Sequence, residues 1–370
     1  MKKLLTILVM FIIISLLCLF ILLPKEDFSE IENRSLTNLP KFSLSKIVDG
    51  SYMEDIEEYI NDHFPFRNIF MNIRTISNKF IGKENIGDVY FSNDGYLIEK
   101  YDELRNQDRI ISVINDFYDN NIDKNISVMF VPTKIFVYQD KLPKNVDVYN
   151  QGDLIKYLYD GLNNDIKKIG IGNRLLEEKD NYQLFYKTDH HWTSYGAYFG
   201  YMEYALENNI DYIDISLFNK EVISDSFIGS TYSKVVDPMS MNEEIVLFNY
   251  KSYDMDVNYV MSNKNTKTLY NFLYLNKKDK YAMFLDNNHP LIKITNNDIS
   301  NGDTLLVIKD SYANSMIPFL VNHYNYIYVI DPRYYKKSIS KYMDENNIND
   351  VLFLYNIGTL SSDSNILSVR

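Results

Sequence analysis

Residues 182–209 read YQLFYKTDHHWTSYGAYFGYMEYALENN, a predicted strand and a predicted helix joined by a polar turn. The first six residues are mostly apolar or aromatic, which is typical of a strand, and the later ones predict a helix with Thr193 or Ser194 as its N-cap. The turn contains Asp189, His190 and His191. In doubly wound α/β folds, ligands bind at such turns, outside the carboxyl ends of the strands.

The alternation of strand and helix continues on both sides of this segment. Predicted strands at 126–132, 304–309, 326–331 and 351–355 alternate with predicted helices at 102–120, 154–169, 311–324 and 337–346. This pattern predicts an α/β fold with a flavodoxin-like parallel sheet and helices on both of its faces. Residues 88–100 predict a hairpin, and the short alternating segments of residues 211–293 predict a β-rich insertion.

The N-terminus carries a long apolar segment. Residues 4–23 are almost wholly apolar and match the length of a helix that crosses a bilayer, and Lys2 and Lys3 precede them. Positive charge before the segment favours an N-terminus in the cytoplasm and a chain that continues outside. We predict a signal anchor over residues 1–24, a polar tether over 25–46 and a catalytic domain over 47–370. A cleavable signal peptide is the alternative, although no small-x-small cleavage site follows the run.

Charge and cysteine content exclude several classes of function. The chain has 38 Lys and Arg against 50 Asp and Glu, a net charge of -12, so it lacks the basic footprint of a nucleic-acid-binding protein. Its single cysteine, Cys18, lies inside the apolar segment. We therefore expect neither a disulfide nor a thiol nucleophile in the folded part.

A second polar turn, Lys309-Asp310-Ser311-Tyr312, follows the predicted strand 304–309. A serine at the start of a helix lies near unpaired backbone N–H groups, which stabilise a developing oxyanion. Ser311 is therefore a candidate nucleophile, although such serines also serve as plain helix caps. In the first turn, Asp189 and His191 are two residues apart and can share a face, as a carboxylate that orients an acid–base histidine requires.

Both turns belong to a family resemblance that covers most of the chain beyond the anchor. The specific runs are TDHHWTSYGAY (188–198) and KDSYANSMIPFL (309–320), and weaker ones are ENRSLTNLP (32–40), FPFRN (64–68), VPTKIFVYQDKLP (131–143), FIGSTYSK (227–234) and YAMFLDNNHPL (281–291). The sequence resembles the DHHW family, which is similar to the alginate O-acetyltransferases that carry an Asp-x-His-Trp motif. The resemblance implies an SGNH hydrolase-like fold with Asp189 orienting His191, His191 as general base and Ser311 as nucleophile. Candidate oxyanion donors are the backbone N–H of Tyr312 and the side chains of Asn288 and His289.

The function that this resemblance implies is acyl transfer outside the cell membrane. We expect an acetyl group to pass through Ser311 to a polysaccharide hydroxyl, with a membrane-bound O-acyltransferase as partner and with no cofactor. A carbohydrate esterase would use the same residues. A non-catalytic glycan-binding or scaffold protein of the cell envelope is a further alternative.

Other charged residues near the predicted strand ends have open roles. Lys134 and Arg333 follow strands and either face the site or are solvated, and Lys309 either binds an anionic group or is exposed. An Asp-His-His run also occurs in metal sites, but the additional Asp and His clusters that such sites need are missing from the sequence. We therefore predict no metal.

Overall fold

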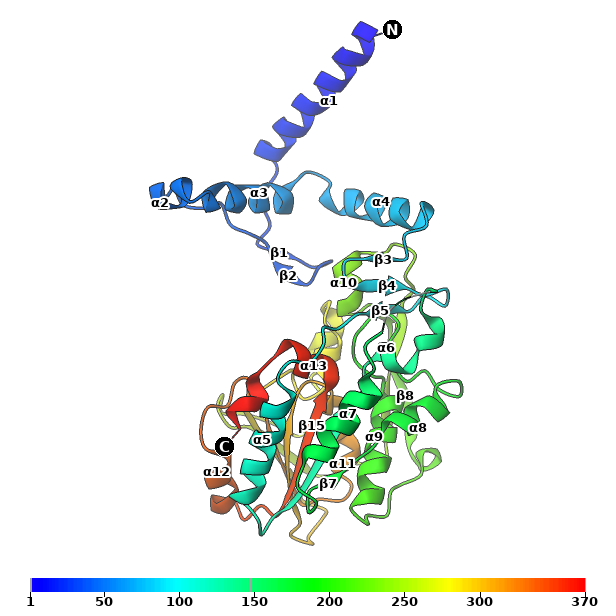
Figure 1. Cartoon of the computed structure of the whole chain (residues 1–370), viewed down its shortest axis with the longest axis vertical. Coiled ribbons are helices and arrows are strands. Elements are labelled where there is room, and N and C mark those ends of the chain that lie inside the picture. Colours follow the sequence, from blue (N-terminus) through cyan, green and yellow to red (C-terminus); the bar gives the residue numbers. More distant parts are fainter. Residues whose placement is uncertain (1, 145, 147, 370) are drawn as a thin grey trace. The chain divides into compact units, whose positions relative to one another are not determined.

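The computed structural model describes residues 2–144, 146 and 148–369 and divides into two compact units (Figure 1). Unit 1 comprises residues 1–86 and Tyr232–Ser240, and unit 2 comprises Gly87–Thr231 and Met241–Arg370. Residues 47–86 thus group with the N-terminal segment, whereas the sequence analysis placed them in the catalytic domain. The reason is that they form helices that pack among themselves and on the segment 232–240.

Unit 1 begins with α1 (Lys2–Leu22), the one helix in the described part of the chain that is long and apolar enough to cross a membrane. It continues with the short hairpin β1 (Phe28–Ser29) and β2 (Arg34–Ser35), then α2 (Leu44–Val48), α3 (Ser51–His63), α4 (Arg67–Phe80) and β3 (Asn85–Ile86). Helix α10 (Ser230–Val235) leads into its second segment.

The expected tether contains ordered structure. Buried Asp62 of α3 accepts hydrogen bonds from Arg34 (3.0 Å to Nη1) and from the backbone N–H of Thr37 (2.8 Å). Arg67 of α4 forms an ion pair with Glu32, with Nη2 3.0 Å from Oε1. These bonds fasten residues 32–37 to two helices, so this part of the segment is folded.

Unit 2 is built on an eight-stranded mixed sheet with the order β11-β10-β12-β14-β13-β15-β6-β7. Its strands are β6 (Asn125–Val131), β7 (Lys167–Lys168), β10 (Met255–Tyr259), β11 (Lys264–Thr266), β12 (Leu291–Asn296), β13 (Thr304–Lys309), β14 (Tyr326–Ile330) and β15 (Asp350–Asn356). From β14 to β7 neighbouring strands are parallel, while β12, β10 and β11 are antiparallel. The prediction of a parallel sheet is therefore wrong for three of the eight strands, because part of the expected insertion pairs with β14.

Hydrophobic cores cover both faces of this sheet, as the sequence predicted. Along β13, Leu305 and Val307 belong to the core under α9 (Ser194–Glu207) and α11 (Ala313–Leu320), while Leu306 and Ile308 face the opposite core. The second core holds α5 (Gln107–Asp119), α7 (Gln151–Gly161), α12 (Ile339–Glu345) and α13 (Ile357–Ser362) (Figure 1). Side chains alternate between faces with the period of two that a strand imposes.

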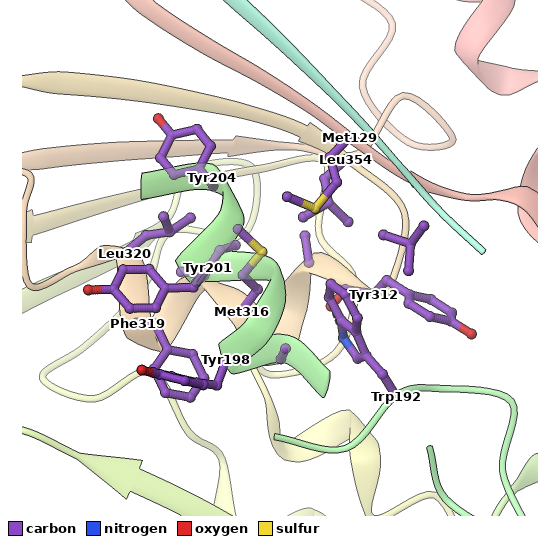
Figure 2. Close-up of a cluster of buried hydrophobic side chains, with 14 of the residues drawn as sticks. Met129, Trp192, Tyr198, Tyr201, Tyr204, Tyr312, Met316, Phe319, Leu320 and Leu354 are labelled. Carbon is purple, nitrogen blue, oxygen red and sulfur yellow. Dashed lines mark hydrogen bonds between the residues drawn. The ribbon is translucent and has the colours of Figure 1, made fainter. Parts of the chain in front are cut away.

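Helices α9 and α11 pack closely beside the polar turn that precedes α9 (Figure 2). A Cβ at Gly196 would lie 2.5 Å from the carbonyl oxygen of Leu184, and one at Gly200 would lie 2.9 Å from the Trp192 ring. These two glycines let the helix approach its own leading turn. Trp192 and Tyr312 consequently lie at the same end of the buried cluster.

The remaining elements lie around this sheet. The predicted hairpin forms from β4 (Val89–Phe91) and β5 (Leu97–Glu99), and β8 (Asn219–Phe227) pairs with β9 (Glu243–Asn249). Short helices are α6 (Lys134–Val137), η1 (Gln139–Lys141), α8 (Gly172–Glu178), η2 (Ile215–Leu217), η3 (Phe272–Asn276), η4 (Tyr281–Met283) and η5 (Asn365–Ser368). The strand predicted at 182–187 does not form. Only a single bridge between Phe185 and Trp192 is present there, because the segment folds back on its own turn.

Candidate active site

Asp189, His191 and Ser311 form a continuous line of hydrogen bonds. His191 Nδ1 lies 2.6 Å from Asp189 Oδ1, and His191 Nε2 lies 2.8 Å from Ser311 Oγ. The first two residues precede α9, and Ser311 lies between β13 and α11. Two turns that are 120 residues apart in the sequence are thus brought together.

Asp189 is buried and held as a carboxylate by several donors. Its Oδ1 also accepts the backbone N–H of His191 at 2.9 Å, and its Oδ2 accepts the backbone N–H of Ser230 at 2.7 Å. Burial opposes the charged form, but the adjacent histidines and these hydrogen bonds keep the Asp189 pKa well below its usual value. A Cβ at Gly229 would lie 2.2 Å from Asp189 Cβ, so only glycine fits beside this carboxylate.

His191 is neutral at neutral pH. Burial, assisted by His190 and opposed by the Asp189 carboxylate, lowers the pKa of His191 to about 4. Since Asp189 accepts the Nδ1 proton, Nε2 carries the lone pair that accepts the Ser311 hydroxyl proton. The imidazole stacks on the Tyr281 ring, with centroids 3.8 Å apart and planes 10° from parallel.

The aromatic residues around this line connect the two turns. The Trp192 indole N–H donates to the carbonyl oxygen of Tyr312 and to Ser315 Oγ, both at 2.9 Å. In return, the Tyr312 hydroxyl donates to the carbonyl oxygen of His190. These bonds fix the histidine turn and the serine turn against each other, which sets the distance between His191 and Ser311.

The backbone N–H of Tyr312 has another role than the one expected. It donates to Asp310 Oδ1 at 2.9 Å, while Asp310 Oδ2 accepts the backbone N–H of Asn356 at 2.7 Å. Because this N–H is already used, it is not directed at an oxyanion. Asp310 instead ties the serine turn to the end of β15.

Lys309, Asn288, Asp331 and Arg333 form a polar group next to the serine turn, in which Lys309 and Asp331 are buried and Asn288 and Arg333 are partly exposed. Lys309 Nζ donates to Asn288 Oδ1 at 2.6 Å and lies 3.6 Å from Asp331, and both charged side chains are fully buried. Arg333 binds the same Asp331 carboxylate through Nε (2.9 Å) and Nη2 (2.6 Å). Burial lowers the pKa of Lys309 to about 8. Neither cation is a solvated loop charge, and both neutralise Asp331.

The sequence matches the profile of a known protein family. The profile of the DHHW protein family matches residues 75–330, which is more than half of the chain. The chain belongs to the DHHW family. No curated protein matches the sequence of this DHHW-family chain.

The chain is also similar to solved structures, the first two of which share its fold. A crystal structure of a DHHW family protein from Eubacterium siraeum is 21% identical, with a TM-score of 0.64 over 75% of this chain and 92% of that one. Bacillus cereus PatB1 with a sulfonyl adduct is also 21% identical, with a TM-score of 0.64 over 77% of this chain and 100% of that one. The O-acetyltransferase domain of Pseudomonas putida AlgJ is 12% identical, with a TM-score of 0.45 over 75% of this chain and 93% of that one.

Two other predicted residues serve the framework of this DHHW-family fold. Buried Lys134 donates to the carbonyl oxygens of Leu97 (2.9 Å) and Lys187 (3.3 Å), and burial lowers its pKa to about 8. His289 Nε2 donates to the carbonyl oxygen of Asp286 at 2.9 Å. Their polar atoms bind protein groups away from Ser311 Oγ.

One group in the described ranges has the spacing of a metal site. Ligand atoms of Asp189, His190 and His191 lie within 4.8 Å of one another. His190 Nδ1 lies 2.7 Å from Ser230 Oγ, and His191 uses both ring nitrogens in the hydrogen-bonded line. A cation at this position would compete with those bonds.

Several residues that shape the site carried no role in the sequence analysis. Gly229, Ser230 and Tyr281 lie in runs that contributed to the family resemblance, but nothing in their spacing indicated contact with the histidine turn. Trp192 belongs to the Asp-x-His-Trp motif and is buried, as a core anchor beneath the turn would be, but the sequence did not indicate its hydrogen bonds to the serine turn. The one local sequence signal for these residues was Gly229 followed by Ser230 at the start of α10.

Proposed function

We propose that this protein is an extracytoplasmic serine O-acetyltransferase that modifies a cell-surface or secreted polysaccharide. In this proposal Ser311 is the nucleophile, His191 the general base and then general acid, and Asp189 the residue that orients His191. The observation that carries the proposal is the pair of hydrogen bonds, 2.6 and 2.8 Å long, that connects a carboxylate, a neutral imidazole and a serine hydroxyl.

The reaction has two acyl-transfer steps. Ser311 Oγ attacks the carbonyl carbon of the acetyl donor while its proton passes to His191 Nε2, and the proton then leaves with the donor's departing oxygen. The acetyl group remains on Ser311 as an ester. A sugar hydroxyl attacks that ester, His191 accepts its proton, and the same proton returns to Ser311 Oγ when the tetrahedral intermediate collapses.

We assign Asn288 as the oxyanion donor. Lys309 donates to its Oδ1 at 2.6 Å and Asn314 donates to the same atom at 3.3 Å. Two donors on Oδ1 fix the orientation of the amide. Its Nδ2 donates one N–H to Asn287 Oδ1 at 3.2 Å, so the second N–H of Nδ2 is the one proposed to face the substrate. A side-chain amide donor placed in this way stabilises the charge of the tetrahedral intermediate.

The proposed location is the outer face of the cell membrane. In this proposal helix α1 acts as the anchor, and a membrane-bound O-acyltransferase, the partner that the sequence resemblance implied, delivers acetyl groups. An anchored enzyme holds its serine near such a donor, and the acceptor is a glycan.

The first test is covalent labelling of Ser311 in the full chain with a sulfonyl fluoride, followed by intact mass and peptide mapping. PatB1, which shares the fold, has been seen with a sulfonyl adduct, so the reagent class suits the scaffold. We expect one adduct on Ser311, none in Ser311→Ala, and an unchanged adduct in Ser216→Ala, which removes an exposed hydroxyl of η2. A folded wild type that takes up no reagent would refute the nucleophile.

The second test separates transfer from hydrolysis. The labelled acetyl group of p-nitrophenyl acetate is followed with and without polysaccharide. Acetyl recovered on the glycan, dependent on Ser311 and His191, supports a transferase. Acetate released at the same rate with and without glycan indicates an esterase. Glycan binding that Ser311→Ala leaves intact, with neither product, indicates a scaffold.

A further inference from the structure

Helix α4 exposes apolar side chains along one face. Phe66, Ile69, Phe70, Ile73 and Phe80 are between 47% and 90% exposed. Residues 66, 69, 73 and 80 recur at three-, four- and seven-residue intervals, so they form one row along the helix. An ordinary surface helix turns such a row toward the core.

The opposite side of α4 makes polar contacts within unit 1. Buried Thr75 donates its hydroxyl to the carbonyl oxygen of Val235 at 2.7 Å, and Lys79 Nζ lies 2.6 Å from an Asp237 carboxylate oxygen. The side that packs on the rest of the unit is therefore polar, and the outward side is apolar. This reversed amphipathicity indicates that the outward face meets an apolar medium.

The start of α4 lies beside the end of the apolar helix α1. One cavity is lined both by Leu23, Pro24 and Lys25, which follow α1, and by Phe66 and Ile69 of the apolar row. The Phe20 ring of α1 also contacts the Tyr59 ring of α3 edge to face, with centroids 6.1 Å apart. The 21 residues of α1 span about 32 Å, which matches the hydrocarbon core of a bilayer. The first turn of α4 is thereby at the level where a membrane-spanning α1 leaves the lipid.

We propose that α4 lies on the outer surface of the bilayer, with the row Phe66, Ile69, Ile73 and Phe80 inserted among the lipid acyl chains. The occupant of this surface is the lipid bilayer itself, since α1 ends next to it within the same unit. Helix α3 is outside the proposed surface, because it carries Glu54, Asp55, Glu57 and Glu58. The contact gives the protein a second membrane attachment that does not depend on the proposed acyltransferase activity.

The test places an environment-sensitive fluorophore on single cysteines of the full chain in lipid nanodiscs. Cys18 is first replaced by serine, and NBD is then attached to Ile73→Cys, Phe80→Cys or the control Asn78→Cys. Position 78 is about 160° around the helix from position 80 and about 140° from position 73. Lipids with a doxyl quencher high on the acyl chain report insertion, and iodide reports exposure to water.

We expect doxyl lipids to quench the label at 73 and 80 at least about threefold more than at 78. Ile76 is a further exposed apolar residue of α4, about 40° around the helix from position 80. The substitutions Ile69→Glu and Ile76→Glu together should abolish the doxyl quenching at position 80. Melting temperatures equal to that of the parent protein show that each variant is folded. Labels at 73 and 80 that iodide quenches and doxyl lipids do not would overturn the proposal. Labels shielded from both quenchers would also overturn it and indicate a protein partner, such as a second copy of the chain.

Discussion

The rate of Ser311 labelling should fall at low pH, and the pH at which it falls should be set by the pKa of His191. Burial lowers the His191 pKa from its ordinary value of 6.5 to about 4. Relative to a solvated histidine, this difference favours the neutral imidazole by about 3 kcal/mol. The neutral form is the one that accepts the serine proton, and it predominates above the pKa.

The assay is the second-order rate of sulfonylation by phenylmethylsulfonyl fluoride, read by intact mass from about pH 3.5 to about pH 8. We expect a half-maximal rate near pH 4 and a plateau above about pH 6, because His191 is already neutral there. An inflection at or above pH 6.5 would refute the reasoning, since it would mean that burial does not hold the imidazole neutral.

Two variants shift this inflection in opposite directions. His190 is the second cause, after burial, that lowers the His191 pKa, so His190→Gln should move the inflection upward. Asp189 raises the same pKa, so Asp189→Asn should move it downward and reduce the plateau about 100-fold or more, because the imidazole loses the carboxylate that orients it. Shifts of the same sign in both variants would contradict the electrostatic account.

Three further changes test the framework of the site. Trp192→Phe removes the indole N–H that links the two turns, along with its bonds to the Tyr312 carbonyl and Ser315 Oγ, and it leaves a cavity in the core. We therefore expect the free energy of unfolding in urea to fall by about 2–4 kcal/mol. Gly229→Ala places a methyl group against Asp189 and should slow sulfonylation at least about tenfold in a protein that still melts cooperatively; an unchanged rate would contradict the packing argument. Lys309→Met breaks a fully buried charge pair and should cost about 3 kcal/mol by urea denaturation, while Ser216→Ala should cost almost nothing.

Local sequence patterns correctly predicted the strands and helices that depend mainly on neighbouring residues in the chain. The strand 304–309 and the helix after Thr193 form as expected, and the Thr193 hydroxyl accepts the N–H groups of Tyr195 and Gly196. The part of the sheet formed by β10, β11 and β12 was not predictable, because the alternation of apolar and polar residues does not determine that residue 291 pairs with residue 330.

The segment 182–187 shows why composition alone misled. Phe185 and Tyr186 are buried, as in a strand, but the backbone of the segment bonds to its own turn: Thr193 N–H donates to the Leu184 carbonyl at 2.8 Å. The three residues of the proposed triad were identifiable from two short motifs. Their supports, Ser230 and Tyr281, come from segments whose approach only the tertiary structure specifies.

The strand order has a consequence for biogenesis. β15 lies between β13 and β6, so the last strand of the sheet to be synthesised is the one that joins its two halves. Until residues 350–356 are available, β6 and β13 have no common neighbour, and Asn356 is not yet present to hold Asp310. We therefore expect the serine turn to become ordered only after residues 350–356 have been synthesised. In the proposed extracytoplasmic enzyme, such a delay would keep Ser311 inactive until folding is completed outside the membrane.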